Sequence, residues 1–220
     1  MIKAVLFDLD GTLLPMSEKT FTEGYFKMLC KKLAPLGYEP ETLVKTIWTG
    51  TKAMVNNDGK KTNEQVFWET FASIYGTEKL KDRAVFEDFY ANDFNGSKIF
   101  CGENPQAKEI IEYVKDKGIK IVLATNPLFP NFAMIVRAGF LGLNEDDFDY
   151  VSGYENSHYA KPNPKYYLEV LETNGLKADE VVYFANNKTE DYDPATSVGI
   201  KTLLIKGEGL TLEEVKTVLD

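Results

Sequence analysis

Two aspartates, Asp8 and Asp10, stand where an apolar run ends in a glycine turn, within the stretch FDLDGTLL. The run begins at Ile2 and is partly β-branched, a composition typical of strands that are covered on both faces. Carboxylates are costly at such a place unless something balances their charge. The pair therefore indicates a site that holds water or a cation.

Polar side chains follow the other apolar runs of the chain as well, and one lysine precedes a predicted helix that begins with an Asn-Pro pair. Carboxylates, a hydroxyl, an amide and an ammonium group together suit phosphoryl transfer. They supply a nucleophile, an acid or base, donors for phosphate oxygens and a cation site. The further candidates are Thr125, Asn126, Lys161, Asn186, Asn187, Glu190 and Asp191.

The apolar runs must position these side chains. They begin at Ile2, Ile119, Val181 and Ile200, and DYVSGY, from Asp149, is a further candidate strand. Each of the four runs is short, is bounded by glycine, proline or polar residues, and is followed by a segment long enough for a crossover helix. This alternation predicts an α/β fold with a mostly parallel sheet. Ligands bind at the carboxyl ends of the strands in such sheets, so the polar residues are expected to converge there.

The segment from about Met16 to Lys98 breaks the alternation. It has no convincing buried strand, but apolar residues recur three and four apart, as in Phe67, Phe71 and Ile74. We predict a core made of residues 1–15 and 99–220, with an inserted helical module at 16–98. Aromatic residues of this module could line a substrate pocket, although a stripe at helical spacing is more often core. These aromatic residues are Tyr25, Phe26, Trp48, Trp68 and Tyr75.

Composition excludes several classes of protein. A chain of 220 residues with 44% hydrophobic residues can bury one core with a smaller module. Its net charge of −9 argues against nucleic acid or an anionic membrane as the main partner. Cys30 and Cys101 lie far apart, so neither a disulfide framework nor a zinc site is expected. We expect no signal peptide and no membrane span, and hence a cytoplasmic protein with reduced thiols.

Four stretches in their usual order resemble the haloacid dehalogenase-like superfamily: DLDGTLL, LATN, the lysine of AKPNP, and VVYFANNKTEDYDPATSVGIKTLLI. The resemblance covers nearly the whole chain. It implies a Rossmann-like core with helices on both faces of the sheet, an all-α cap at 16–98, and a Mg²⁺-dependent phosphatase. The stretches ATNPLFP and KPNPKYY also look like a bacterial subgroup of predicted hydrolases.

The resemblance also implies roles for the candidate residues. Asp8 is expected to attack phosphorus and form an aspartyl-phosphate, and Asp10 to act as general acid and base. Adjacent like charges push carboxylate pKa values apart, which suits these two roles. Thr125, Asn126 and Lys161 are expected to bind phosphate. An Asp8 carboxylate oxygen and the backbone carbonyl of Asp10 are expected to ligate Mg²⁺.

The last stretch departs from the family pattern. Most members place an aspartate after this strand, and the subgroup often reads GND, whereas this chain reads Ala185-Asn186-Asn187. The amide oxygens of Asn186 and Asn187, with the carboxylate of Asp191, are the remaining candidate ligands. We therefore predict a metal site that keeps its shape and binds Mg²⁺ more weakly than an Asn187→Asp variant does.

Two hypotheses follow from these residues. The first is a phosphatase that hydrolyses a small phosphomonoester, with a phosphomutase as a narrower variant. The second is a non-catalytic phosphate- or ligand-binding protein of the same fold, favoured by the ANN sequence. His158 is expected to be a solvent-facing loop residue, and Glu190 a solvated side chain rather than a compensating metal ligand.

Overall fold

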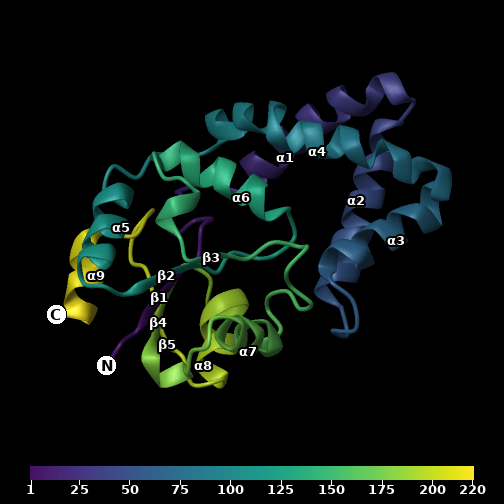
Figure 1. Cartoon of the computed structure of the whole chain (residues 1–220). Coiled ribbons are helices and arrows are strands. Elements are labelled where there is room, and N and C mark those ends of the chain that lie inside the picture. The colour runs from purple at the N-terminus through teal and green to yellow at the C-terminus, as the bar shows by residue number, and fades with distance from the viewer.

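The computed structural model describes residues 1–220 and contains one parallel sheet of five strands in the order β3-β2-β1-β4-β5 (Figure 1). The strands are β1 Ala4–Phe7, β2 Lys120–Leu123, β3 Tyr150–Val151, β4 Val181–Ala185 and β5 Lys201–Leu204. All four apolar runs form strands, and DYVSGY supplies the fifth. The predicted α/β fold with a Rossmann-like parallel sheet is confirmed.

The first strand, β1, lies in the middle of the sheet. Ala4 is paired with Lys120 of β2 on one side and with Val181 of β4 on the other. The four residues of β1 are fully buried, and their side chains alternate between two hydrophobic clusters, with Val5 and Phe7 in one and Ala4 and Leu6 in the other. Both faces of the sheet are therefore covered, as the uninterrupted apolar run predicts.

Helices cover the two faces unequally. The smaller cluster packs β1 and β4 against α7 and α8, whereas the larger cluster includes residues of α5, α6 and α9 (Figure 1). Each of these helices follows a strand or precedes one, as in crossover connections. Their bounds are α5 Ala107–Asp116, α6 Asn131–Ala138, α7 Pro164–Thr173, α8 Asp193–Ser197 and α9 Leu212–Leu219.

The segment between β1 and α5 is helical and contains no strand. Its longer helices are α1 Glu18–Leu33, α2 Pro40–Val55, α3 Asn63–Tyr75 and α4 Arg83–Ala91. Figure 1 shows α2 and α3 farthest from the sheet, with α1 and α4 closer to α6. One hydrophobic cluster runs without interruption from Val5 in the sheet to Phe71 in α3. The division into a core and an inserted module stays a prediction.

The predicted apolar stripe of α3 is correct in two of its three positions. Phe67 and Phe71 are buried, but Ile74 is 45% exposed, and in the last turn it is Tyr75 that packs against the core, with its ring 5.0 Å from that of Phe71. The helix begins with a capping box in which the Thr62 hydroxyl accepts the N–H of Gln65, and the Gln65 side chain accepts the N–H of Thr62. This cap fixes where α3 starts.

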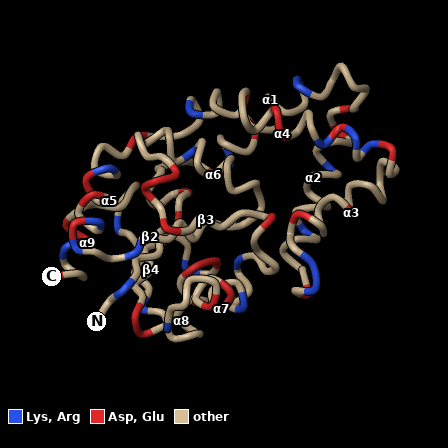
Figure 2. Tube along the Cα trace, viewed as in Figure 1, with Lys and Arg blue, Asp and Glu red and all other residues tan.

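Charged residues occur in both the sheet region and the helical segment, without one dominant basic cluster along the trace (Figure 2). Cys30 and Cys101 both carry free thiols. None of the helices combines the length and the apolar composition that crossing a membrane requires. The expected cytoplasmic location and the exclusion of nucleic acid stay predictions.

Candidate active site

A cavity of about 250 Å³ lies at the carboxyl ends of β1, β2 and β4. Every candidate site residue predicted from the sequence lines it, Glu190 included. The backbone N–H of Asp8 donates to the carbonyl of Phe184, so the pairing of β1 with β4 extends to the first candidate residue. The lining residues predicted beforehand are Asp8, Asp10, Thr125, Asn126, Lys161, Asn186, Asn187, Glu190 and Asp191.

A buried ammonium group joins two buried carboxylates at the bottom of this cavity. Lys161 Nζ lies 2.8 Å from Asp8 Oδ1 and 2.7 Å from Asp191 Oδ1, and all three side chains are almost completely buried. The second oxygen of Asp8, Oδ2, accepts a hydrogen bond of 3.0 Å from the Thr12 hydroxyl. One positive charge faces two negative charges, so the cluster has an excess of negative charge when both carboxylates are ionised.

Two tyrosines that the sequence reasoning missed complete this cluster. The Tyr183 hydroxyl accepts a hydrogen bond of 2.7 Å from Lys161 Nζ and donates one of 2.7 Å to Asp191 Oδ1. Tyr167 donates to the same oxygen at 3.3 Å. Tyr183 stands in the middle of VVYFA, a strand buried at every position. Because a buried tyrosine hydroxyl requires a partner, its place in that strand was the available signal.

Burial and charge shift the protonation of this cluster. Burial, reinforced by the negative charges of Asp191 and Asp10, raises the pKa of Asp8 to about 7, although Lys161 opposes the shift. Burial alone would lower the pKa of Lys161, but the charges of Asp191 and Asp8 together raise it well above its usual value. The lysine therefore stays charged, and Asp8 changes its charge near neutral pH.

Asp10 is held by a buried arginine that the sequence reasoning also missed. Both carboxylate oxygens of Asp10 contact the guanidinium of Arg137, with 2.6 Å between Nη1 and Oδ2. The Arg137 side chain is fully buried in α6, 4.1 Å from the ring of Phe21, whereas 35% of the Asp10 side chain is exposed. An arginine inside the apolar run FAMIVRA was the signal, since a buried guanidinium needs an anionic partner.

Thr125 and Asn126 connect the end of β2 to the rest of the site. Thr125 is buried, and its carbonyl accepts a hydrogen bond from the Tyr166 hydroxyl at 2.9 Å. Asn126 Oδ1 accepts the backbone N–H of Lys161 at 3.2 Å, and its Nδ2 donates to Glu190 Oε1 at 3.1 Å. Asn126 therefore fixes the position of the lysine loop in addition to facing the cavity.

Lys161 reaches the site because it precedes α7. As expected, Asn163 caps this helix by accepting the N–H of Lys165, and Pro164 is its first residue. Glu190 is partly buried in the cavity wall rather than solvated, and burial raises its pKa. His158 lies outside the cavity, where its half-exposed ring contacts Glu169 at 2.6 Å from Nδ1 to Oε1.

The two asparagines after β4 differ in what their side chains do. Asn187 Oδ1 accepts the N–H groups of Thr189 and Glu190, so this oxygen caps the turn that follows. Asn186 packs against Gly11, where an added Cβ would lie 2.1 Å from Asn186 Nδ2 and where φ is +75°. The amide oxygen of Asn187 is therefore already used by the protein, and that of Asn186 is not.

The donors at this edge of the sheet fit a hard divalent cation. Asp8 and Asp191 supply two carboxylates with excess negative charge, and the backbone carbonyl of Asp10 and the Asn186 amide are oxygen donors from adjacent loops. No group of three His, Cys, Asp or Glu side chains is placed to hold a metal by itself. Mg²⁺ is commonly held by one or two carboxylates and several waters, and the donors here are of the oxygen type that it prefers.

Comparison with known proteins places the chain among hydrolases. The profile of the family described as haloacid dehalogenase-like hydrolase matches residues 2–199. The phosphorylated carbohydrates phosphatase of Thermotoga maritima is 35% identical over 92% of this chain and 84% of its own length. The phosphoglycolate phosphatase of Aquifex aeolicus is 26% identical over the same shares. A crystal structure of a HAD phosphatase from Thermococcus onnurineus shares the fold, with a TM-score of 0.59, 22% identity and coverage of 99% and 98% of the two chains.

Proposed function

Because this chain belongs to the haloacid dehalogenase-like hydrolases, we propose that it is a phosphatase that hydrolyses a small phosphomonoester through an aspartyl-phosphate. The enzyme class, a phosphoric monoester hydrolase, agrees with the names of the relatives. The observation that carries the proposal is the buried cluster of Asp8, Lys161 and Asp191 beside Asp10 in one cavity. It provides a nucleophile, a fixed positive charge and a second carboxylate for proton transfer.

In the first half of the reaction, the ionised carboxylate of Asp8 attacks phosphorus while the bond from phosphorus to the alcohol oxygen breaks. Asp10, as the general acid, donates a proton to the departing oxygen. In the second half, Asp10 takes a proton from water as that water attacks phosphorus, which releases phosphate and restores the Asp8 carboxylate. A divalent cation bound by Asp8 would oppose the effect of burial on the pKa of this carboxylate, which favours its ionised, nucleophilic form.

Lys161 and Arg137 hold the two aspartates in place. The ammonium of Lys161 has three hydrogens, and its neighbours are Asp8, Asp191 and the Tyr183 hydroxyl. We propose that it mainly offsets the charge of the carboxylates and reaches phosphate by exchanging one of these contacts. The contacts of Arg137 with both carboxylate oxygens of Asp10 fix the orientation of that carboxylate. Mg²⁺, when bound by Asp8, Asp191 and the Asp10 carbonyl, would offset the charge of the phosphate group.

The helices α1 to α4 supply much of the cavity wall that faces the sheet edge. We propose that this segment, residues 16–98, acts as a cap that excludes water and selects the alcohol part of the substrate.

The test is phosphate release from an aryl phosphomonoester, with and without Mg²⁺, by the protein, by Asp8→Asn and by the control Asp179→Asn. Asp179 is an exposed aspartate outside the cavity. We expect release that requires Mg²⁺, that is lost in Asp8→Asn and that is unchanged in Asp179→Asn. Equal release by the protein and Asp8→Asn would overturn the proposed mechanism.

The Asn187 amide oxygen caps a turn and is therefore not free to bind a metal. This favours a second candidate function, a protein that binds phosphate without useful turnover. Asn187→Asp separates the two. If the unmodified protein releases no phosphate and Asn187→Asp does, the metal site of this chain is too weak for catalysis, and the binding function is the better description.

A further inference from the structure

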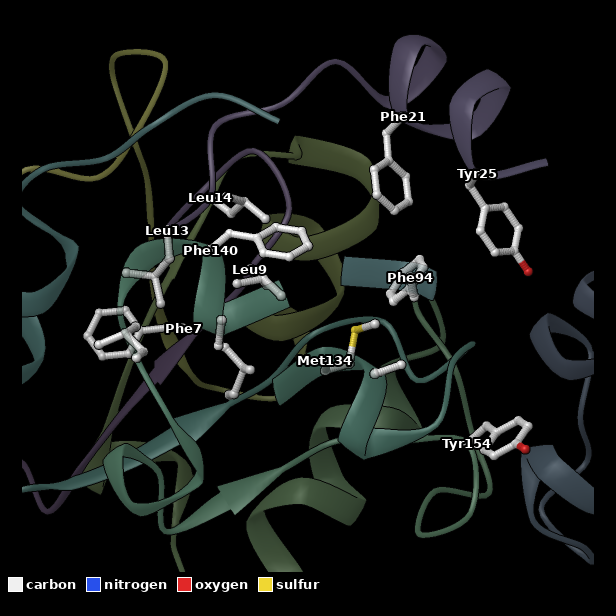
Figure 3. Packing of buried hydrophobic residues seen from close by; sticks show 14 of the residues in the cluster. Phe7, Leu9, Leu13, Leu14, Phe21, Tyr25, Phe94, Met134, Phe140 and Tyr154 are labelled. Atoms are coloured by element: carbon white, nitrogen blue, oxygen red, sulfur yellow. The ribbon is translucent and has the colours of Figure 1, made fainter. Parts of the chain in front are cut away.

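The cavity wall opposite the aspartates is apolar and largely aromatic. It is formed by side chains of α1 to α4 and of the loop after β2, among them Phe21, Tyr25, Trp48, Trp68, Tyr90 and Phe129. Phe21 and Tyr25 extend from the same side of α1 toward Phe94 (Figure 3), and both make edge contacts with its ring. The hydroxyls of Tyr25 and Tyr90 are hydrogen bonded to each other at 2.7 Å. One phenol donates to the other, so only one of the two hydroxyl hydrogens is left without a partner in this pair.

The charges around the cavity are almost all negative. Asp8, Asp10, Glu18, Glu190 and Asp191 line it, and Lys161 is the one cationic residue that does. The contacts of that ammonium with two carboxylates and a tyrosine hydroxyl leave it no free hydrogen. The guanidinium of Arg137 lies outside the lining and is bound by Asp10. A carboxylate on the alcohol part of a substrate would thus face aromatic rings and the neutral hydroxyls of Thr22 and Thr51, with no cationic side chain free to pair with it.

The size of the cavity suits a ring in addition to a phosphoryl group. An apolar cavity of about 150 Å³ is large enough to bind benzene. At about 250 Å³, this cavity has room for one aromatic ring with a phosphoryl group beside Asp8. Trp48 is 49% exposed and lines the cavity, which places it at the opening to solvent.

We propose that this site selects phosphomonoesters whose alcohol part is uncharged and apolar, with an aromatic ring, and rejects those whose alcohol part carries a carboxylate. The inference rests on the proposed phosphatase function and adds the class of its substrate. Burying a ring against the aromatic wall is favourable, whereas burying an unpaired carboxylate there is costly. When the phosphoryl group lies beside Asp8, the alcohol part of the substrate must occupy the rest of this cavity and contact the aromatic wall.

Binding of inert phosphonates tests the inference without requiring turnover. Benzylphosphonate and phosphonoacetate share a methylene phosphonate and differ only in a phenyl ring or a carboxylate. The chain has two tryptophans, Trp48 and Trp68, and both line the cavity, so intrinsic fluorescence reports binding. With excess Mg²⁺ present, and with calorimetry as a second readout, we expect benzylphosphonate to bind at least about tenfold more tightly.

A matched pair of variants checks that the wall sets this preference. Thr51→Lys adds a cation to the lining on α2, and Ile74→Lys adds the same cation at an exposed position of α3 outside the cavity. We expect Thr51→Lys to reduce the preference for benzylphosphonate at least about fivefold, because the new ammonium pairs with phosphonoacetate, and Ile74→Lys to leave it unchanged.

Equal or tighter binding of phosphonoacetate by the unmodified protein would overturn the inference, and so would a failure of both phosphonates to bind. Neither result bears on phosphate release from an aryl ester, which tests the phosphatase function itself. Release of phosphate without a preference among phosphonates would retain the phosphatase and reject the substrate class.

Discussion

Replacing the nucleophile Asp8 by asparagine should stabilise the fold at alkaline pH, because burial makes the ionised carboxylate costly. The pKa of Asp8 is about 7 in the folded chain, against about 4 for an unfolded aspartate. Between these values the unfolded chain releases a proton that the folded chain retains, so the free energy of unfolding falls as pH rises. The stability that Asp8 contributes by keeping its proton in the folded chain is fully present below about pH 4 and is lost above about pH 7.

The size of the effect follows from the shift. One pKa unit corresponds to about 1.4 kcal/mol, so a shift of about three units costs about 4 kcal/mol in total. Between pH 4.5 and pH 8 the contribution of Asp8 to the free energy of unfolding falls by about 3 kcal/mol. The Asp8→Asn variant would keep the packing, because the carbonyl oxygen of the new amide can accept from Lys161 and its nitrogen can donate to the Thr12 hydroxyl, reversing the present bond.

Urea unfolding of the protein and of Asp8→Asn, at pH 4.5 and pH 8 with a chelator present, measures this difference. We expect the variant to gain about 3 kcal/mol relative to the protein between the two pH values. Titrating groups that do not interact with Asp8 contribute equally to both chains and cancel. A stability difference that is the same at both pH values would refute the reasoning, because it would mean that Asp8 is ionised across the whole range.

Three further predictions concern the neighbours of the two aspartates. Arg137→Met should lower kcat for an aryl phosphomonoester at least about tenfold, because Asp10 loses its orientation; unchanged kcat would contradict a positioning role. Asn187→Asp should bind Mg²⁺ more tightly in calorimetry while still capping its turn, and equal affinity would remove the idea that ANN weakens the site. Tyr183→Phe should lower the free energy of unfolding by about 1–3 kcal/mol, since Lys161 loses a buried partner; urea curves that overlap those of the protein would argue against this.

The sequence predicted the strands and the convergence of the site because each depends on local patterns. Buried parallel strands read as short apolar runs, and polar residues after such runs must meet at one edge of the sheet. The helix α7 was predictable from the Asn-Pro pair at Asn163 and Pro164. The four motifs of the family gave the order of these elements.

The missed residues depend on contacts between distant segments. Arg137 and Asp10 are 127 positions apart, and nothing in either stretch specifies the other. Tyr183 is an ordinary strand residue until Lys161 is placed beside it. Ile74 and Tyr75 both follow Phe71 at helical spacing, and only the packing of α3 decides that Tyr75 rather than Ile74 faces the core. Tertiary packing, which a single sequence does not encode in its local pattern, decides all three.

The central position of β1 has a consequence for how the chain is made. The strand is synthesised first, but its neighbours β2 and β4 lie more than a hundred residues downstream. At about 5–20 residues per second, β1 waits at least several seconds before a partner leaves the ribosome. Its apolar residues stay without their native cover during that time, while the helices α1 to α4 emerge. A chain interrupted before β4 would carry Asp8 and Lys161 but neither Tyr183 nor Asp191, and the edge of β1 that pairs with β4 would stay open, as a target for chaperones and proteases.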